Sequence, residues 1–425
     1  MTRRSLHLTL AATAMVVWAC ADPGGETTAG SSTGAADASE TEGGTPASES
    51  GSQGSTDGAG VTAEDVLISL ADNVFAPTHA AFSEAADALS SAAATHAQAV
   101  ADGGDVATSR EAVEVAFGDL AVALQHVELL QLGPAAGSSG IEGEFLRDEL
   151  YSWPAVNTCR IDQELVVGEY GAADFTDTRL VNVYGFDALE YLLFSGSPDN
   201  TCPPQLPING SGEWDALGEA EVEVRRAAYA AGVASAMATV ADDLESTWAE
   251  GGAWHGYLSD PSSGPLESTS AAMDEVLRAM FYIDKSLKDI KLARPAGIKD
   301  CSADVCLDEV ESLWAGLSKE QAVANLAAFR QLMWAGPSAD EGVGFDDLLS
   351  AVGEGALGEE MLADTTAAID ALEAVEGTFV DALTADAAAL DASHAAVVEL
   401  TDDLKGDFPI VLMLNVPSEA AGDAD

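Results

Sequence analysis

Apolar side chains recur every three or four residues along most of this chain, and this spacing is the feature that most limits its fold. Between residues 111 and 132, one such stripe consists of Val113, Phe117, Leu120, Leu124 and Val127. Residues at these spacings lie on one face of an α-helix, whereas a half-buried strand would show a sustained two-residue alternation, which no segment has. The sequence therefore predicts an all-α protein.

The same spacing places the individual helices. Long helices are expected over residues 62–101, 111–132, 179–194, 213–249, 268–292, 318–335 and 357–404, with a break near residue 377. Shorter helices are expected near residues 142–151, 159–168 and 344–353. The Pro- and Gly-rich segment 195–212 interrupts the pattern, so we expect two helical-bundle halves, residues 61–205 and 206–415, and a disordered tail over 416–425.

The first 60 residues have the features of an export and anchoring segment. Arg3 and Arg4 precede an apolar run over residues 6–17 that is too short to span a bilayer, and Cys20 follows Ala19. We interpret residues 1–19 as a lipoprotein signal peptide and Cys20 as the lipidated residue that anchors the protein to a membrane; a soluble secreted protein is the alternative. Residues 20–60 are rich in Gly, Ser, Thr and acids and are expected to form a disordered tether.

The charge of the chain restricts its partners. There are 17 Lys and Arg residues against 72 Asp and Glu residues, a net charge of −55. Such a chain repels phosphate backbones, which argues against nucleic-acid binding, and attracts cations, including metal ions. One basic segment stands out, in which Lys285, Lys288 and Lys291 share a helix face. We expect these lysines to form ion pairs within the protein, with an anion site as the alternative.

Beyond Cys20 the chain has four cysteines, Cys159, Cys202, Cys301 and Cys306. An even number of cysteines in an exported chain indicates disulfides. Proximity in the sequence favours the pairs Cys301–Cys306 and Cys159–Cys202, and the other two connectivities stay open. A four-thiolate zinc site is disfavoured because no Cys-x-x-Cys pair is present.

Residues 183–194 form the segment with the most chemical information. It is apolar nearly all round, which predicts a buried helix, and Asp187 and Glu190 lie three residues apart on one face. Buried carboxylates must be neutralised by a cation, hydrogen-bonded, or protonated with a raised pKa. Gly185 would let another backbone or a ligand come close. The alternative is that both acids bond neighbouring helix ends and fix the register of the bundle.

Several segments together resemble a known family. Residues 185–190 (Gly-Phe-Asp-Ala-Leu-Glu) resemble the Gly-x-His-x-x-Glu signature of the imelysin-like proteins. Residues 152–162 are similar to the Trp-Pro and Arg-Ile-Asp segment of that family, and residues 128–134 to its helix ending at Gly-Pro. Residues 311–314 and 342–349 resemble its Glu-Ser and Gly-x-Gly segments. The likeness covers roughly residues 61–415 in the right order.

The resemblance implies an all-helical fold of two bundle-like halves, export to the cell envelope and an association with iron uptake. It implies a site between the halves, where Glu190 matches the signature Glu and Asp187 stands in place of the signature His. Glu128 and Asp162 match family acids and are candidate further ligands. An all-oxygen set suits hard cations such as calcium, magnesium or ferric iron. The alternative is that the site has lost its metal.

Our leading hypothesis is a lipid-anchored cell-envelope protein that binds a metal ion or metal-loaded ligand between two helical bundles. We expect it at the outer membrane, facing the periplasm or the cell surface, in iron uptake and alongside an iron-transport component. A second hypothesis is a metallopeptidase of the imelysin type, which we disfavour because Asp187 replaces the signature His and no zinc ligand set is evident. A third is a non-catalytic interaction protein that has lost the metal site.

Overall fold

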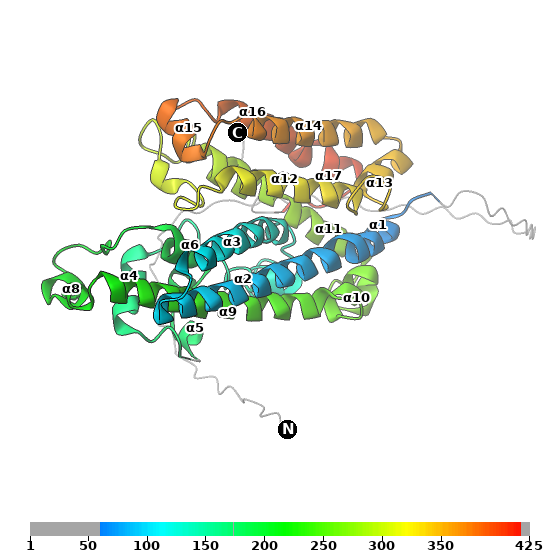
Figure 1. Ribbon diagram of the computed structural model, residues 1–425. Coiled ribbons are helices and arrows are strands. Elements are labelled where there is room, and N and C mark those ends of the chain that lie inside the picture. Colours follow the sequence, from blue (N-terminus) through cyan, green and yellow to red (C-terminus); the bar gives the residue numbers. More distant parts are fainter. Residues whose placement is uncertain (1–59, 173, 418–425) are drawn as a thin grey trace, which may run out of the picture. The chain divides into compact units, whose positions relative to one another are not determined.

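Every regular element is helical, without a strand, in residues 60–172 and 174–417, the part of the chain that the computed structural model describes (Figure 1). This confirms the all-α prediction. The predicted signal peptide, the lipidation site at Cys20 and nearly all of the predicted tether lie outside the described residues, as does most of the predicted tail. Within the described part, no helix is long and apolar enough to cross a membrane.

Three long helices form the lower layer in Figure 1. They are α2 (Ala76–Asp102), α3 (Val106–Glu128) and α9 (Glu219–Trp248). Helix α2 packs along both α3 and α9, and many alanines on α2 and α9 allow their backbones to lie close together. Helix α2 continues α1 (Ala63–Leu70) through a π-helical turn, η1 (Ala71–Phe75), so the predicted helix over residues 62–101 is confirmed.

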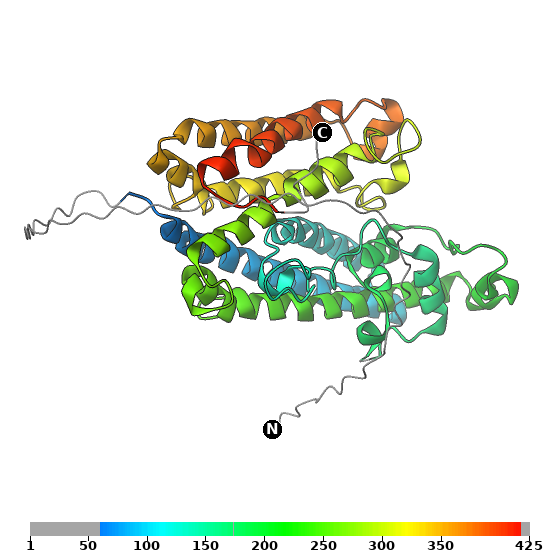
Figure 2. The same cartoon turned by 180° about the vertical axis from the view of Figure 1, so that it is seen from behind.

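The upper layer in Figure 1 comes from the C-terminal part of the chain. Its main helices are α12 (Ser318–Trp334), α14 (Gly355–Glu373) and α16 (Asp391–Lys405). Helix α14 packs on both α12 and α16, and α12 also packs on α3 of the lower layer. Helix α11 (Thr269–Met280) and the π-helix η5 (Ile283–Ala293) lie between these groups in the sequence, and η5 packs on α16 and α12. Seen from behind, the orange and red C-terminal helices stay in the upper layer (Figure 2).

Shorter elements complete the two layers. They are η2 (Gly133–Ala135), α4 (Thr158–Val167), α5 (Phe175–Thr178), η3 (Val181–Val183), α6 (Phe186–Phe194), α7 (Pro207–Gly210), α8 (Glu213–Leu217), α10 (Ala253–Ser259), η4 (Pro261–Ser263), η6 (Leu307–Glu309), α13 (Phe345–Val352), α15 (Phe379–Ala385) and α17 (Asp407–Val411). Local chemistry sets many of their ends. Asn157 caps α4 by accepting a hydrogen bond from the Arg160 amide, and Thr378 caps α15 in a capping box with Asp381.

Several predicted helices differ from the structure. The predicted helix over residues 213–249 breaks at Gly218, and the one over 357–404 breaks a second time at residues 386–390. Residues 142–151 form turns, because the amides of Glu144 and Leu146 bond the carbonyl of Pro134 and the amide of Phe145 bonds that of Ala136. These tertiary bonds replace the local bonds of a helix. The predicted helix over residues 179–194 is interrupted, since α6 begins only after Gly185 and a 3₁₀ turn precedes it.

The predicted boundary over residues 195–212 does not separate the two hydrophobic cores. Helix α9 follows this boundary, yet Tyr229 and Met237 on α9 belong to the core of α2, α3 and α6. Helix α1 precedes it, yet Leu67 belongs to the core of α11, α12 and α14. The two hydrophobic cores therefore do not follow the division into residues 61–205 and 206–415, because each core contains residues from both predicted halves.

Two disulfides are present in the described part of the chain. Cys159 pairs with Cys202, and Cys301 pairs with Cys306. The first joins α4 to the segment before α7, and the second closes a short loop after η5. The pairing favoured by sequence proximity is therefore confirmed.

Candidate functional site

Helix α6 lies buried in the core of the lower layer. Eight of its nine residues are buried, all but Phe194, and Phe186 stacks on Phe117 of α3. A Cβ atom added to Gly185 would lie 2.8 Å from the carbonyl oxygen of Leu150. The same oxygen accepts a hydrogen bond from the Phe186 amide at 2.6 Å. The predictions of a buried helix and of a close backbone approach at Gly185 are both confirmed. The close backbone is the end of the 142–151 turn segment.

Asp187 and Glu190 both point into protein and are 2% and 1% exposed. The Oδ2 atom of Asp187 accepts hydrogen bonds from the amide of Ser152 at 2.9 Å and from its hydroxyl at 3.1 Å. The Oε1 atom of Glu190 accepts hydrogen bonds from the amides of Trp314 and Ala315, both at 2.8 Å. The two carboxylates thus fasten α6 to two loops that are far apart in the sequence.

Burial changes the acidity of both groups. It raises the pKa of Asp187 to about 6, although the hydrogen bonds from Ser152 act in the opposite direction. Burial also raises the pKa of Glu190 to about 8; the amides of Ala315 and Trp314 oppose this, while the charges of Asp187 and Glu311 add to it. At neutral pH these values leave Glu190 largely protonated.

A lysine ammonium forms the centre of a second buried cluster. Lys291, on η5, donates to Oε2 of Glu128 at 3.0 Å and lies 2.9 Å from Oε1 of Glu311. It also donates to Oδ1 of Asn325 at 3.1 Å and to the side-chain oxygen of Gln125. Four segments that are distant in sequence therefore meet at one charged group. We call these five side chains the Lys291 cluster.

The two acids of the Lys291 cluster differ in how far nearby positive charge offsets the effect of burial on their pKa. Burial raises the pKa of Glu128, but Lys291 and Arg147, whose guanidinium donates at 2.7 Å, outweigh it and hold that pKa below its ordinary value. For Glu311, burial outweighs Lys291 and raises the pKa. The Oε2 atom of Glu311 is buried and has no hydrogen-bond partner in the described part of the chain.

Two tyrosines complete the surroundings of these acids. The Tyr151 hydroxyl donates to Glu311, and the Tyr282 hydroxyl donates to Glu128. Burial and the neighbouring carboxylates raise the pKa of both phenols well above their ordinary value, so both stay protonated donors.

The fourth predicted ligand, Asp162, lies in a different environment. It accepts hydrogen bonds from the Tyr191 hydroxyl at 3.0 Å and from the amide of Thr201 at 2.8 Å, next to Cys202 of the disulfide. The four predicted ligands therefore lie in three different environments. Asp187 and Glu190 lie on α6, Glu128 lies in the Lys291 cluster, and Asp162 bonds the loop that carries Cys202. The described residues contain no group of three or more His, Cys, Asp or Glu side chains that could hold a metal ion.

A resident metal ion does not fit the Lys291 cluster. Lys291 already supplies positive charge between Glu128 and Glu311, and donors occupy Asp162. One oxygen of Asp187 and one of Glu190 are engaged by amides. The positive charge beside Glu128 and Glu311 therefore comes from the protein itself.

Sequence reasoning missed Glu311, Tyr151 and Tyr282 as members of the site. The signal for Glu311 was its place in the Glu-Ser segment that resembles the family. The basic segment was predicted correctly to form internal ion pairs, since Lys291 pairs with Glu128 and Lys288 lies 2.8 Å from Asp284.

An open pocket borders the buried side chains. Its volume is about 530 Å³, and its wall includes Arg147, Tyr151 and Ser152. These three residues are the direct partners of Glu128, Glu311 and Asp187, respectively. Trp153 and Asn182 also line this pocket. We call this space the antechamber, because one layer of side chains separates it from the buried acids.

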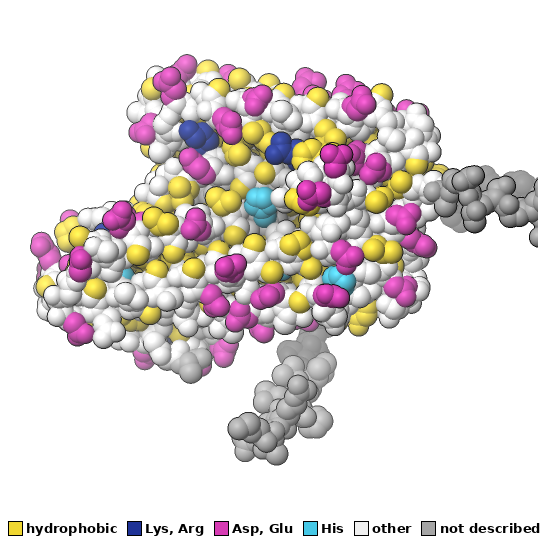
Figure 3. All heavy atoms as spheres, turned by 45° about the vertical axis from the view of Figure 1, so that its right-hand side comes forward, with side chains coloured by type: hydrophobic (Ala, Val, Ile, Leu, Met, Phe, Trp, Pro, Cys, Tyr) yellow, Lys and Arg dark blue, Asp and Glu magenta, His cyan; other side chains and the backbone are white. Residues whose placement is uncertain are grey.

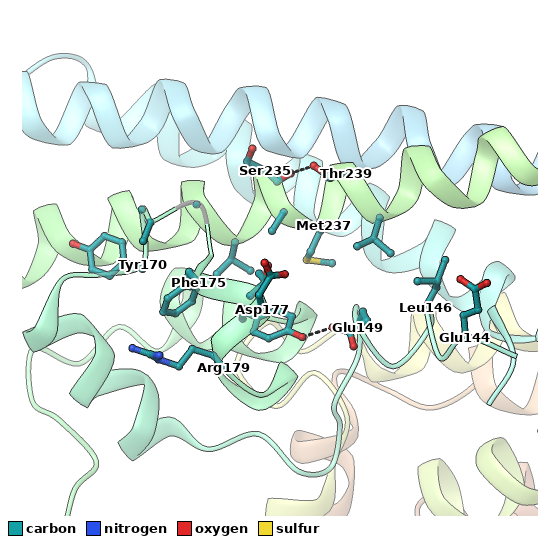
Figure 4. A pocket seen from close by; sticks show the side chains of 18 residues that line it. Glu144, Leu146, Glu149, Tyr170, Phe175, Asp177, Arg179, Ser235, Met237 and Thr239 are labelled. Carbon is teal, nitrogen blue, oxygen red and sulfur yellow. Dashed lines mark hydrogen bonds between the residues drawn. The ribbon is translucent and has the colours of Figure 1, made fainter. Parts of the chain in front are cut away.

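A larger pocket of about 780 Å³ adjoins the antechamber and shares Glu149, Arg179 and Tyr184 with it. In Figure 4, Ser235, Met237 and Thr239 come from α9. Tyr170, Phe175 and Asp177 come from the segment facing α9, and Glu144, Leu146 and Glu149 come from the turn segment (Figure 4). The combined lining carries aromatic rings, acids and two arginines, Arg147 and Arg179.

Comparison with protein families decides the affiliation of the chain. The model of the imelysin family matches residues 75–405. The chain belongs to the imelysin family. The family resemblance inferred from the sequence motifs is thereby confirmed.

Solved structures show the same fold. An iron-regulated protein A precursor, so named, from Parabacteroides distasonis has a TM-score of 0.64 and 18% identity, over 83% of this chain and 96% of that one. An imelysin-like protein from Psychrobacter arcticum has a TM-score of 0.60 and 17% identity, over 84% of this chain and 98% of that one. No curated protein matches this chain.

Proposed function

We propose that this imelysin-family protein binds a metal-loaded ligand in its antechamber and acts in iron handling at the cell envelope. In this proposal Cys20 carries the lipid anchor, the protein is held at the outer membrane, and an iron-transport component receives the ligand. The observation that carries the proposal is the antechamber itself, whose wall is made of the partners of Glu128, Glu311 and Asp187. The name of the Parabacteroides relative, an iron-regulated protein, supports the link to iron.

The size and charge of the antechamber favour a metal chelate. Its volume of about 530 Å³ lies within the range of small-molecule sites, roughly 300–1,000 Å³. Its lining combines Arg147 and Arg179 with Asp148 and Glu149. A chelate has a cationic metal centre and anionic oxygen donors, so a lining with both signs of charge can meet both parts. The partly buried Trp153 offers an apolar surface to the organic part of the ligand.

A second candidate is the non-catalytic interaction protein that has lost the metal site. The built-in ammonium of Lys291 favours it, because the buried acids Glu128 and Glu311 already have a positive partner. A bare metal ion at Asp187 and Glu190 is a third outcome. In that case the cation would replace the proton of Glu190.

Thermal unfolding with three additions separates these candidates. We propose ferric citrate as the chelate, citrate alone as its control, and calcium chloride as the bare cation. Ferric citrate should raise the melting temperature of the wild type in a saturable way, since a ligand that binds only the folded state stabilises it. Trp153→Ala should remove most of this increase. Trp334→Ala, which alters a partly buried tryptophan outside the antechamber, should retain it.

The remaining outcomes each select another candidate. A saturable shift at low stoichiometry with calcium alone, lost in Glu190→Gln, would identify a bare-ion site on α6. Equal responses of wild type, Trp153→Ala and Glu190→Gln to every addition would contradict binding at this site and favour the interaction protein.

A further inference from the structure

A second pocket opens on another face of the protein, between the two layers of helices. It has a volume of about 600 Å³ and lies between α2, α3, the C-terminal half of α12 and the loop that follows α12. None of its lining residues belongs to the antechamber or to the Lys291 cluster. Figure 3 shows a face on which hydrophobic side chains gather around a histidine at the junction of the layers. We call this space the interlayer pocket.

Small apolar side chains create the interlayer pocket. Ala81 and Ala85 lie one turn apart on α2, and Ala123 faces them from α3. Alanine at these positions leaves free space where a longer side chain would fill the groove between the helices. Pro77 and Val122 extend the same apolar wall, and Val122 is 40% exposed. The wall therefore offers an apolar surface open to solvent.

The charged groups that line the pocket all have one sign. Asp72, Asp119 and Glu341 line the interlayer pocket, and its lining contains no lysine or arginine. Asp72 accepts a hydrogen bond from Nε2 of His255 at 2.8 Å, whereas Asp119 and Glu341 lie on the exposed rim. The electrostatic potential inside should therefore be negative.

A histidine in the lining does not reverse this charge. The Nδ1 atom of His126 lies 3.3 Å from Oε1 of Gln331 on α12. Burial lowers the pKa of His126, with the hydrogen bond to Gln331 acting in the opposite direction, so the ring is neutral at pH 7. Neutral His126, Gln331 and Asn73 add hydrogen-bonding groups without positive charge.

We propose that the interlayer pocket binds a small amphiphilic organic cation. Its apolar body would lie against Ala81, Ala85 and Ala123, and its ammonium or similar cationic group would face Asp119 and Glu341. An anion of the same shape would meet only carboxylates, and an inorganic cation would leave the apolar wall unused. The volume limits the occupant to the size of a small molecule. This site is separate from the antechamber and does not depend on iron handling.

Two probes of equal shape and opposite charge test this proposal. Tetraphenylphosphonium and tetraphenylborate carry the same four phenyl rings, so their difference isolates the sign of the charge. Isothermal titration of the full protein in about 0.15 M salt, where the Debye length is roughly 8 Å, weakens long-range attraction to the acidic surface. We expect one saturable site for the phosphonium and none for the borate.

Variants locate the binding. Asp119→Asn combined with Glu341→Gln should weaken phosphonium binding about tenfold, which corresponds to the loss of about 1.4 kcal/mol. Ala81→Trp, on the exposed rim of α2, should block binding by filling the groove. Glu359→Gln combined with Asp370→Asn removes the same net charge from exposed positions on α14 and should bind like wild type.

Three results would overturn the proposal. Equal binding of the borate would show that the pocket selects only for apolar shape. Equal weakening by the α14 control pair would show that general surface charge, rather than the pocket, holds the cation. Unchanged phosphonium binding in Ala81→Trp, with a wild-type circular dichroism spectrum, would place the cation elsewhere.

Discussion

Replacing Lys291 by methionine tests how the buried acids are stabilised. The ammonium is 2% exposed and contacts Glu128 at 3.0 Å and Glu311 at 2.9 Å, so its removal leaves two buried carboxylates without their shared cation. Removing one partner of a buried ion pair typically costs about 3–5 kcal/mol of folding free energy. Methionine has a similar length, so loss of packing should add little. Glu128 keeps Arg147, and the loss should fall mainly on Glu311.

The cost of Lys291→Met should depend on pH in a defined direction. Burial already raises the pKa of Glu311, and loss of the ammonium should raise it further. A carboxyl whose folded-state pKa is raised binds its proton more tightly in the folded state, so stability is lost as pH rises towards that pKa. The difference between wild type and Lys291→Met should therefore be larger at pH 8 than at pH 5.

Urea unfolding followed by circular dichroism measures this cost. Adding Glu311→Gln to Lys291→Met should recover part of the lost free energy, because the uncompensated charge is then removed. Lys285→Met is the matched control on the same helix; its side chain is 30% exposed, and we expect a cost below about 1 kcal/mol. The reasoning fails if Lys291→Met costs no more than Lys285→Met, or if the double variant is no more stable than Lys291→Met.

Three further predictions follow from other parts of the chain. Cys20→Ser should release the protein from membranes in a fractionation assay, and wild type found only in the soluble fraction would contradict the anchor. Replacing Cys159 and Cys202 by serine should cost about 3–4 kcal/mol in urea unfolding, since the disulfide spans 43 residues; an unchanged midpoint would refute this. Glu190→Gln should become increasingly stabilising from pH 5 to pH 8, because ionisation of Glu190, with a pKa of about 8, opposes folding. A stability difference that does not vary with pH would contradict it.

Local patterns in the sequence were sufficient to predict several features of this protein. The apolar spacing predicted α3, and the apolar character of residues 183–194 predicted the burial of α6. Both disulfides follow from short separations in the sequence. The ion pairs of Lys291 with Glu128 and of Lys288 with Asp284 follow from the presence of a few basic residues in a strongly acidic chain. In each case the deciding interaction depends on residue type, periodicity or overall charge.

The composition of the site could not be predicted in the same way. Lys291 meets Glu128 across 163 residues, and Tyr151 meets Glu311 across 160 residues. Such contacts depend on how helices cross, and periodicity alone does not determine which helices are neighbours. The same reason explains why the cores do not follow the predicted boundary at residues 195–212, because α9 returns to pack on α2. It also explains why Asp162 was grouped with Asp187 although it serves another loop.

An aspartate at position 187, where the motif resemblance predicts a histidine, changes what this part of α6 can do. One carboxylate oxygen of Asp187 accepts both the amide and the hydroxyl of Ser152, whereas a neutral imidazole has a single acceptor nitrogen. The charge of Asp187 also raises the pKa of Glu190, which a neutral imidazole would not do. Aspartate at position 187 and a protonated Glu190 are therefore linked. Together they tie α6 to the wall of the antechamber through Ser152 and to the loop at residues 314–315. If the antechamber binds a ligand as proposed, these hydrogen bonds would couple that wall to the buried acids.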